Sequence, residues 1–264
     1  MTPCQEKAPI LRNQRLQGSY YRVDLRAEQI AATVAPGQFV HVQLPAFEHH
    51  VLRRPFSVFN AEPATGTLSL IYKTVGEGTA HLSGLGAGVG LDLLGPLGHG
   101  YSVPPPGQTA VVVAGGYGCA ATYLLVRRSP GPCIVLLGGR TAEDLLLVDE
   151  FTALGADVRL ATDDGSRSHR GVVTDLLEAA LEQTANPFVV ACGPNPMLKA
   201  VCRLVDRRGL DAEVSLDHAM CCGVGACFAC VVKLTADNAD GWEYVRTCKS
   251  GPVFPARLVR WDEG

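Results

Sequence analysis

The feature of this sequence that most restricts its fold is a group of four cysteines near the C-terminal end. Residues 221–230 read CCGVGACFAC, in which Cys222, Cys227 and Cys230 have a four-then-two spacing, and Cys248 follows after 17 further residues. In plant-type 2Fe-2S sites a tight loop supplies three thiolates with this spacing, and a distant part of the chain supplies the fourth. The spacing therefore predicts a 2Fe-2S cluster with these four cysteines as its ligands.

The residues around these cysteines are typical of a loop that folds closely around a cluster. Gly223 and Gly225 can take positive φ at little cost, which lets backbone amides point inward at sulfur. Zinc is the main alternative, but zinc modules usually pair two C-x2-C knuckles and this sequence has one. Only the frame that starts at Cys222 gives the four-then-two spacing, so we expect Cys221 to point away from the metal.

Length and composition indicate a soluble chain with room for more than one domain. The 264 residues are 47% hydrophobic and carry a formal net charge of -3, which leaves no basic stripe for nucleic acid. No apolar run reaches the ~18 residues of a membrane span, and the N-terminal segment is polar where a signal peptide would be apolar. We therefore expect a cytoplasmic protein, in whose reducing compartment ten cysteines indicate metal binding rather than disulfides.

Changes of pattern along the chain predict three domains. The first part holds short β-rich runs such as QFVHVQL, PFSVFN and TLSLIYK between turns, which predicts a small antiparallel barrel. Three consecutive prolines in YSVPPPGQ then mark a boundary. Beyond them, buried strands alternate with amphipathic helices, which predicts a doubly wound parallel sheet, and one of these helices is expected over 142–151. The expected domains are 1–102, 103–212 and 213–264, the last of which contains the cysteines.

Two glycine turns are expected at the carboxyl edge of the parallel sheet. VVVAGGYGCAATYLL runs from a buried strand through Gly115, Gly116 and Gly118 into a helix, as a sheet does when it presents a helix N-terminus to a pyrophosphate. The second turn, in FVVACGPNPMLKAV, consists of Cys192, Gly193 and Pro194. One such turn is as typical of a tight connection without a ligand, but two at one sheet edge suggest a dinucleotide crevice.

The first domain contains residues suited to a flavin nucleotide. In LRRPFSVFN, Arg54 and Ser57 lie on an expected strand. An arginine can neutralise a diphosphate, and a hydroxyl can bind a flavin ring or a phosphate, although each alone is more often an ordinary surface charge or strand serine. Gly76 and then Gly78 and Thr79 open a helix, which offers a second N-terminus to an anion.

Taken together, these motifs carry a resemblance that covers nearly the whole chain. RPFS, YK with GEGT, LGPLGHGY, GGYGCA and CGPNPM resemble the ferredoxin-NADP reductase superfamily, in which a flavin barrel precedes a nicotinamide domain. With SLDHAMCCGVGACFACVVK and TCKSGPVF added, the chain is similar to the electron-transfer subunits of dihydroorotate dehydrogenase B. It departs from them at Ala120 and Ala121, where relatives often carry prolines after the nicotinamide-domain glycines.

The resemblance implies a function and a set of site residues. It implies an NAD-reducing oxidoreductase subunit that takes electrons from the FMN of a dihydroorotate dehydrogenase catalytic subunit and passes them through the 2Fe-2S cluster and FAD to NAD+. The two subunits would form a heterotetramer with two copies of each, acting in pyrimidine (UMP) biosynthesis. The implied FAD-binding residues are Arg54, Pro55, Phe56, Ser57, Ile71, Tyr72, Lys73, Gly78 and Thr79, and the implied cluster ligands are Cys222, Cys227, Cys230 and Cys248. No side chain is expected to act as nucleophile or general base, and the seven histidines are assigned no catalytic role.

Two other functions fit the same motifs. The first is a flavin and iron-sulfur reductase subunit of a hydrogenase, a sulfide dehydrogenase or a ferredoxin-NADP oxidoreductase complex, which would use the same cluster loop. The second is a non-catalytic iron-sulfur or zinc scaffold that senses metal or redox state. A yellow-brown preparation that contains FAD would exclude the second.

Overall fold

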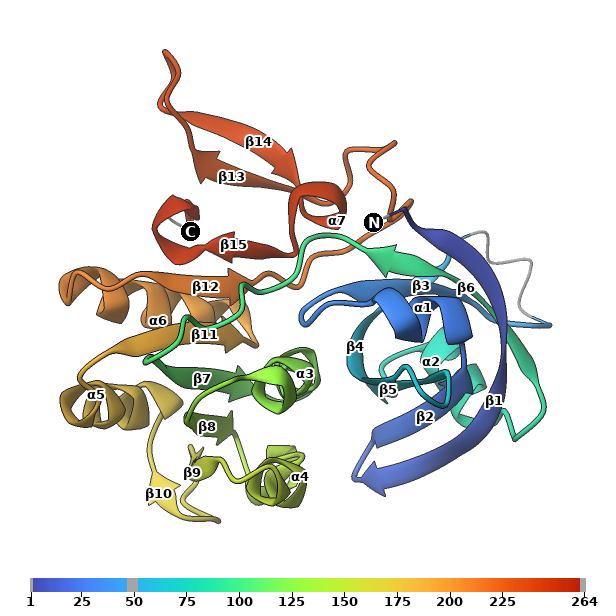
Figure 1. Cartoon of the computed structure of the whole chain (residues 1–264), viewed down its shortest axis with the longest axis horizontal. Helices are drawn as coiled ribbons and strands as arrows, with labels where there is room; N and C mark the ends of the chain where they lie inside the picture. Colours follow the sequence, from blue (N-terminus) through green and yellow to red (C-terminus); the bar gives the residue numbers. More distant parts are fainter. Residues whose placement is uncertain (1, 47–51, 262–264) are drawn as a thin grey trace.

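The computed structural model describes residues 2–46 and 52–261. In these ranges a closed barrel, an open sheet and a small C-terminal segment follow one another along the chain, and Figure 1 shows the C-terminal segment above the other two. The expected combination of an antiparallel barrel with a doubly wound sheet is confirmed. Within the described ranges, no helix has both the length and the apolar character needed to cross a membrane.

The barrel consists of six antiparallel strands in the order β1-β2-β5-β4-β3-β6. Their bounds are β1 Cys4–Gln17, β2 Tyr20–Arg26, β3 Phe39–Gln43, β4 Arg54–Glu62, β5 Thr67–Lys73 and β6 Gly90–Leu97. Alternate side chains point into the barrel, as β3 illustrates, where Val40 and Val42 belong to its core. Phe39 and His41 are on the opposite side of β3 and are nevertheless buried, so another part of the chain must cover that side. Two short helices, α1 Glu28–Thr33 and α2 Glu77–Ser83, complete the barrel.

The second sheet has seven strands in the order β10-β9-β8-β7-β11-β12-β15. Their bounds are β7 Thr109–Gly115, β8 Cys133–Gly139, β9 Asp157–Thr162, β10 His169–Arg170, β11 Pro187–Cys192, β12 Ala212–Ser215 and β15 Val253–Pro255. The strands from β10 to β12 pair in parallel, and β15 pairs with β12 in the antiparallel sense. The almost uninterrupted apolar run of β7 reflects burial on both faces of the sheet.

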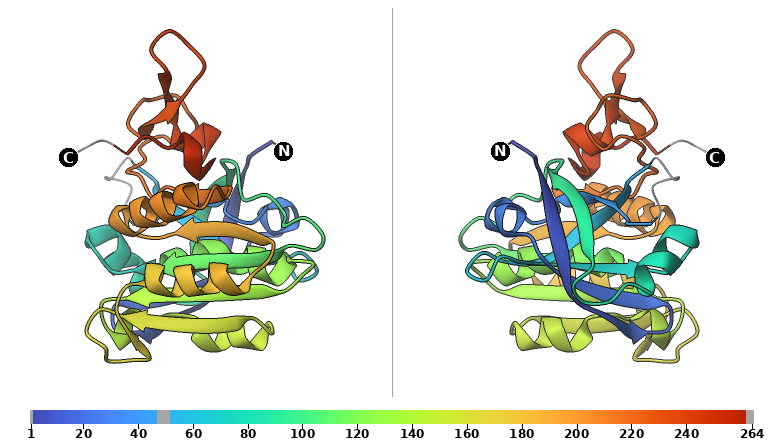
Figure 2. Two further views of the ribbon diagram at one scale, coloured as in Figure 1. Left: turned by 90° about the vertical axis from the view of Figure 1, so that its left-hand side faces the viewer. Right: turned by 90° about the vertical axis from the view of Figure 1, so that its right-hand side faces the viewer.

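Helices cover both faces of this sheet, as a doubly wound domain requires (Figure 2). α3 Gly118–Arg128 and α4 Val148–Ala153 pack on one face, and α5 Val173–Gln183 and α6 Asn195–Arg207 pack on the other. α3 also contacts the barrel, where the rings of Tyr123 and Phe59 on β4 have centroids 4.4 Å apart. Arg127 of the same helix forms an ion pair with Glu62, so α3 joins the barrel to the sheet.

The prediction of one helix over residues 142–151 is wrong in part. The structure has a short 3-10 helix, η1 Ala142–Asp144, and then begins α4 at Val148. Leu145, Leu146 and Leu147 lie between them, and all three are buried. Consecutive residues of a helix point about 100° apart, so a continuous helix could not have turned all three leucines toward one core. Burial of the leucines therefore took precedence over continuation of the helix.

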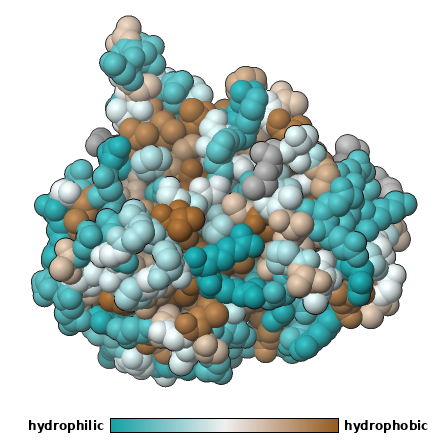
Figure 3. All heavy atoms as spheres, viewed as in Figure 1, coloured by the Kyte–Doolittle hydropathy of each residue, from teal (hydrophilic) through white to brown (hydrophobic). Residues whose placement is uncertain are grey.

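The C-terminal segment leaves the sheet and returns to it. After β12, the cysteine-containing stretch has neither helix nor strand until the hairpin formed by β13 Val231–Thr235 and β14 Trp242–Arg246. α7 Thr247–Ser250 then leads into β15, and η2 Ala256–Leu258 follows. Figure 3 shows hydrophilic residues at the tip of this hairpin and hydrophobic ones near its base, where Val232 and Val245 pack toward the core beneath α6. Since β12 and β15 belong to the sheet, the expected domain division at residue 212 stays a prediction.

Tyr101 fastens the connection between the barrel and the sheet. Its backbone N–H donates to the carbonyl of Pro36 at 2.8 Å, and its hydroxyl donates to the carbonyl of Ala191 in β11 at 3.2 Å. The side chain is 5% exposed, so these hydrogen bonds are shielded from water. The proline-rich connection that follows therefore starts from a fixed point between the two domains.

Replacing Tyr101 by phenylalanine should lower the free energy of unfolding by about 1 kcal/mol, because a buried hydrogen bond of this kind contributes that amount. Urea unfolding followed by circular dichroism measures the change. Tyr244→Phe is the matched control, because Tyr244 is 56% exposed on β14, and it should leave the unfolding curve unchanged. Equal stability of the two variants would contradict the anchoring role of the Tyr101 hydroxyl.

Candidate functional site

The four cysteines of the predicted cluster come together as two pairs. In the first pair, the sulfur atoms of Cys222 and Cys227 are 3.3 Å apart, and the backbone N–H of Cys227 donates to the sulfur of Cys222 at 3.4 Å. The second pair is Cys230 and Cys248, which are buried together in one apolar cluster, and each of these thiols affects the pKa of the other. The second pair depends on Thr247, whose backbone N–H and hydroxyl each donate to the carbonyl of Cys230 at 3.0 Å.

The pKa values of these thiols differ because their surroundings differ. Burial raises the pKa of Cys222, but hydrogen bonds from the backbone amides of Cys227, Val224 and Ala226 outweigh it and lower that pKa to about 6. Burial raises the pKa of Cys248 to about 12, and the neighbouring Cys230 adds to this effect. Inward-pointing amides that favour a thiolate also favour a metal ligand, because the thiolate is the form that binds metal.

The donor set fits a 2Fe-2S cluster. Such a cluster has two irons, and its four cysteine thiolates are divided between them, two on each. Two adjacent pairs of thiols match this division. Gly223 and Gly225 have φ of +70° and +79°, the conformation expected for them from the sequence.

The loop from Cys222 to Cys230 is held against the barrel on one side. Phe39 and Leu97 of the barrel form a small apolar cluster with Cys230 and Cys248. Next to them, the Nδ1–H of His99 donates at 2.8 Å to the carbonyl of Lys249, in the helix that carries Cys248. These contacts, together with that of Gly223 on His41, cover the outer side of β3 and β6. Figure 1 shows the C-terminal segment above the barrel. Cys230 and Cys248 therefore pack directly on the barrel.

The other side of the loop faces solvent. The side chain of Phe228 is 69% exposed and that of Val224 is 50% exposed. The guanidinium of Arg246 lies 5.1 Å from the centroid of the Phe228 ring and donates to the carbonyl of Gly225 at 2.5 Å. An apolar surface beside the thiols is consequently presented outward on a braced loop. Cys221, which precedes the first pair, stays a predicted bystander.

The predicted FAD residues fall into two groups. The first group lies together at the rim of the barrel, where Arg54 begins β4 and packs against Gly78. A Cβ added at Gly78 would be 2.6 Å from Nε of Arg54, so a larger residue here would displace the guanidinium from its present position. Thr79 fixes the turn that precedes α2, since its hydroxyl accepts from the backbone N–H of Val75 at 2.9 Å and from that of Gly76 at 3.2 Å. This arrangement of a guanidinium beside a glycine turn fits a diphosphate.

The second group is less accessible to a ligand. Phe56, Ile71 and Tyr72 are each less than 10% exposed and pack in the protein core, so a ligand would meet their backbone rather than their side chains. Lys73 donates from Nζ to the hydroxyl of Tyr20 at 3.2 Å and lies 4.0 Å from a carboxylate oxygen of Asp144. Lys73 therefore bridges the barrel and the sheet. Pro55 and Ser57 alternate with Phe56 along β4 and are on its outer side.

The two glycine turns lie side by side, as their sequences predict. β7 and β11 are neighbouring parallel strands with Ala114 opposite Cys192, so both turns leave the same edge of the sheet. A Cβ added at Gly118 would be 2.5 Å from the carbonyl oxygen of Cys192, so the backbones of the turns touch. Gly193 approaches Gly115 in the same way, since its Cβ would be 3.0 Å from the Gly115 nitrogen. Pro194 precedes α6 directly, and Gly116 has φ of +53°.

Sequence reasoning missed one link at this edge of the sheet. Tyr117, between the glycines of the first turn, donates from its hydroxyl to a carboxylate oxygen of Asp217 at 2.6 Å. Asp217 belongs to the stretch that leads from β12 to the cysteine loop, so this bond connects the two regions. Burial and this acceptor raise the pKa of Tyr117, which keeps its hydroxyl protonated as the donor. The side chain of Tyr117 is 46% exposed. An aromatic residue between the glycines of such a turn is the sequence signal that could have pointed to this contact.

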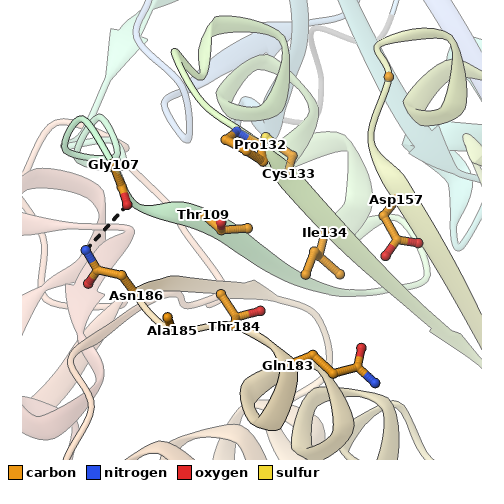
Figure 4. A pocket seen from close by; sticks show the side chains of 11 residues that line it. Gly107, Thr109, Pro132, Cys133, Ile134, Asp157, Gln183, Thr184, Ala185 and Asn186 are labelled. Atoms are coloured by element: carbon orange, nitrogen blue, oxygen red, sulfur yellow. Dashed lines mark hydrogen bonds between the residues drawn. The ribbon is translucent and has the colours of Figure 1, made fainter.

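A separate hollow lies at the opposite edge of the sheet. Figure 4 shows its lining, which includes Thr109 and Ile134 near the amino ends of β7 and β8, and Asn186, whose amide donates to the carbonyl of Gly107 at 3.5 Å. Ligands of open parallel sheets bind at the carboxyl ends of the strands. We therefore assign this hollow no part in cofactor binding.

His49 and His50, two of the histidines assigned no catalytic role, lie outside the described residues.

Comparison with known proteins connects all three parts of the chain to redox proteins. Residues 9–101 match an oxidoreductase FAD-binding domain, residues 112–203 match an oxidoreductase NAD-binding domain, and residues 217–260 match the iron-sulfur cluster binding domain of dihydroorotate dehydrogenase B. The electron transfer subunit of dihydroorotate dehydrogenase B (NAD(+)) from Desulforamulus reducens is 36% identical, over 92% of this chain and 93% of that protein. The protein of the same name from Enterococcus faecalis is 38% identical, over 97% and 98%.

Solved structures give a consistent result. An NADH-dependent reduced ferredoxin-NADP oxidoreductase, studied for flavin-based electron bifurcation, superposes with a TM-score of 0.85 at 28% identity, over 97% of this chain and 90% of that chain. The ferredoxin reductase in carbazole 1,9a-dioxygenase has a TM-score of 0.69 at 22% identity, over 80% and 67%, which shows a shared fold.

Replacing Cys222 by serine should remove most of the bound iron, because it breaks the first thiol pair. Iron content per chain and visible absorption of the purified protein measure the loss. Cys221→Ser is the matched control, since it alters the adjacent thiol, and it should retain iron and colour. Loss of colour in the control but not in Cys222→Ser would move the ligand frame by one residue.

Replacing Gly223 by alanine should also lower iron content. Alanine at positive φ costs about 1 kcal/mol, and the added Cβ would in addition lie 2.6 Å from Cε1 of His41. Gly241→Ala separates the two effects, because Gly241 has φ of +71° and no atom within 4 Å of the added Cβ. The control should keep full iron content, and equal iron content in both variants would contradict the close contact between the loop and the barrel.

Proposed function

The chain belongs to the family of dihydroorotate dehydrogenase B electron-transfer subunits, and we propose that it passes electrons from a partner's FMN through a 2Fe-2S cluster and FAD to NAD+. The observation that carries this proposal is the contact between the cysteine loop and the barrel. One side of the barrel carries the loop, and α3 of the NAD-binding domain packs against the same barrel at β4. The barrel therefore lies between the cysteine loop, which would hold the one-electron carrier, and the NAD-binding domain, which would hold the hydride acceptor.

The order of these parts suits the chemistry. An iron-sulfur cluster exchanges single electrons, NAD+ accepts a hydride, and a flavin works in both modes. The residues of this chain supply binding and orientation. Cys222 and Cys227 would hold one iron, and Cys230 and Cys248 the other. Arg54 would neutralise the FAD diphosphate, which needs charge-assisted hydrogen bonds.

We assign NAD to the touching glycine turns. The turn with Gly115, Gly116 and Gly118 opens α3 and would receive the pyrophosphate at the helix N-terminus. The turn of Cys192, Gly193 and Pro194 would face it across the crevice. The close backbone contact at Gly118 supports this assignment, because it fixes the spacing of the turns.

We also propose the domain division 1–102, 103–212 and 213–264, and a cytoplasmic location.

The partner in this proposal is an FMN-containing dihydroorotate dehydrogenase catalytic subunit, with two copies of each subunit in the complex. The two relatives described above are named as electron transfer subunits, and a subunit of that kind serves a second protein. The exposed Phe228 and Val224 supply an apolar surface next to the cysteines where such a protein can approach. The pathway would be pyrimidine (UMP) biosynthesis.

A second function is favoured by one observation. The superposition on an NADH-dependent reduced ferredoxin-NADP oxidoreductase covers nearly the whole chain, including the C-terminal segment. A reductase subunit in a complex of that kind, or in a hydrogenase or sulfide dehydrogenase, would use the same three parts with a different electron donor.

The purified chain, loaded with FAD and cluster, should reduce an artificial acceptor with NADH but should not oxidise dihydroorotate until a catalytic subunit is added. Dihydroorotate oxidation is not expected because the barrel, the sheet and the cluster segment account for the described residues, and none of these three parts is assigned to that substrate. Orotate formation followed by absorbance, with and without the catalytic subunit, measures this. Orotate production by the chain alone would refute the proposal, whereas NAD+ reduction by reduced ferredoxin without any response to dihydroorotate would favour the second function.

A further inference from the structure

His41 is a buried polar residue at the boundary between the barrel and the cysteine loop. It is on the outer side of β3, since Val40 and Val42 on either side of it point into the barrel core. Its exposed fraction is 0%, and Phe39, two residues earlier on the same side, makes an edge contact with its ring at 5.7 Å between centroids. The layer that buries both residues is the C-terminal segment with its cysteines.

The ring of His41 lacks a hydrogen-bond partner. Among the residues that the structure describes, none bonds to Nδ1 or to Nε2. A buried polar group left in this state costs about 1–3 kcal/mol, and native proteins rarely accept that cost. A partner that is not an amino acid of this chain would remove the cost.

The orientation of the ring shows where that partner must be. A Cβ added at Gly223 would lie 2.6 Å from Cε1, 2.7 Å from Nδ1 and 2.8 Å from Nε2 of His41. These three atoms form the nitrogen-bearing edge of the imidazole. That edge is therefore turned toward the cysteine loop, immediately after Cys222.

On the outer surface of the barrel, His41 and Phe39 also have neighbours in β4, the strand of the proposed FAD motif. On the outer side of the sheet, His41 is opposite Pro55, and Phe39 is opposite Ser57, in the ladder between β3 and β4. His41 thus stands one strand away from the proposed FAD motif. Its nitrogen atoms, however, are directed at the loop rather than along the ladder.

The imidazole of His41 offers an N–H donor in either of its protonation states. Burial lowers the pKa of His41, and the nearby guanidinium of Arg53 acts in the same direction. Arg53 is held in place by Asp92, with 2.8 Å between its Nη2 and a carboxylate oxygen. An N–H at this position suits a soft acceptor that itself bears negative charge.

We propose that the ring N–H of His41 donates a hydrogen bond to a sulfur atom of the 2Fe-2S cluster and thereby raises the cluster's reduction potential. The proposal rests on the cluster assignment of the previous section. Reduction adds negative charge to the cluster, and a donor directed at its sulfur stabilises the reduced form more than the oxidised one. His41 is therefore a positioning and tuning residue, and it exchanges no electron itself.

Replacing His41 by leucine should make reduction of the cluster about tenfold less favourable, a shift of about 59 mV for one electron. A redox titration of the loaded protein, followed by electron paramagnetic resonance of the reduced cluster, measures this potential. The flavin potential, followed by visible absorption in the same samples, should stay constant. A shift of the flavin potential with a constant cluster potential would overturn the proposal and assign the donor to FAD.

Two further variants separate a hydrogen bond from packing. His41→Gln and His41→Asn keep an N–H donor near the positions of Nε2 and Nδ1, so one of them should restore at least half of the shift. Gln43→Leu removes a donor from the next outer position of β3, and it should leave the cluster potential unchanged. Failure of both donor variants to restore any of the shift would reduce His41 to a packing residue.

A measurement on the unaltered residue keeps the test decisive if the leucine variant fails to fold. Protein labelled with ¹⁵N-histidine should show a ¹⁵N hyperfine coupling to the reduced cluster, and the coupling should be lost in His41→Gln. A labelled protein with a full iron content and no such coupling would overturn the proposal and leave the function untouched. Absence of iron from the unaltered protein would instead overturn the function.

Discussion

The antiparallel pairing of β15 with β12 determines where the cysteine loop can lie. The chain leaves the sheet after Ser215 and returns at Val253, opposite it in the ladder, so both ends of the intervening segment are fixed at one sheet edge. On the return, the backbone N–H of His99 in the barrel donates to the carbonyl of Gly251 at 2.5 Å. The barrel, the sheet and the cysteine loop therefore meet at one place, and the contacts of Phe39 and His41 follow from this geometry.

Much of the fold was predictable because the signals were local. The strand TLSLIYK corresponds to β5 residue for residue, and CIVLLGG to β8, since apolar runs between turn residues leave few alternatives. The return of β15 was not predictable, because VFP is three residues long and only tertiary pairing makes it a strand. The three leucines at 145–147 were misread as helical for a similar reason, as their burial depends on a core that no local pattern reveals.

The candidate site, like the fold, was predictable only where its sequence signals are local. The spacing of the cysteines identified their loop, because three ligands are close in sequence and their geometry is local. The pairing of Cys230 with Cys248 and the burial of His41 could not be read in this way. In QFVHVQL the histidine occupies an outward position of an amphipathic strand, which ordinarily faces water. It is buried here because a segment about 180 residues later in the chain covers it, and loop closure over that distance leaves no mark on the local sequence.

The position of β15 also bears on the biogenesis of the protein. A ribosome releases the barrel strands and most of the sheet before the residues of β15 emerge, and domains commonly begin to fold during synthesis. Until that moment β12 is the edge of the sheet, with unpaired backbone groups that invite association with another chain. Completion of the sheet edge and closure of the cysteine loop are then a single late event. Metal delivery to the nascent protein would accordingly be timed by the emergence of β15 rather than by that of the cysteines themselves.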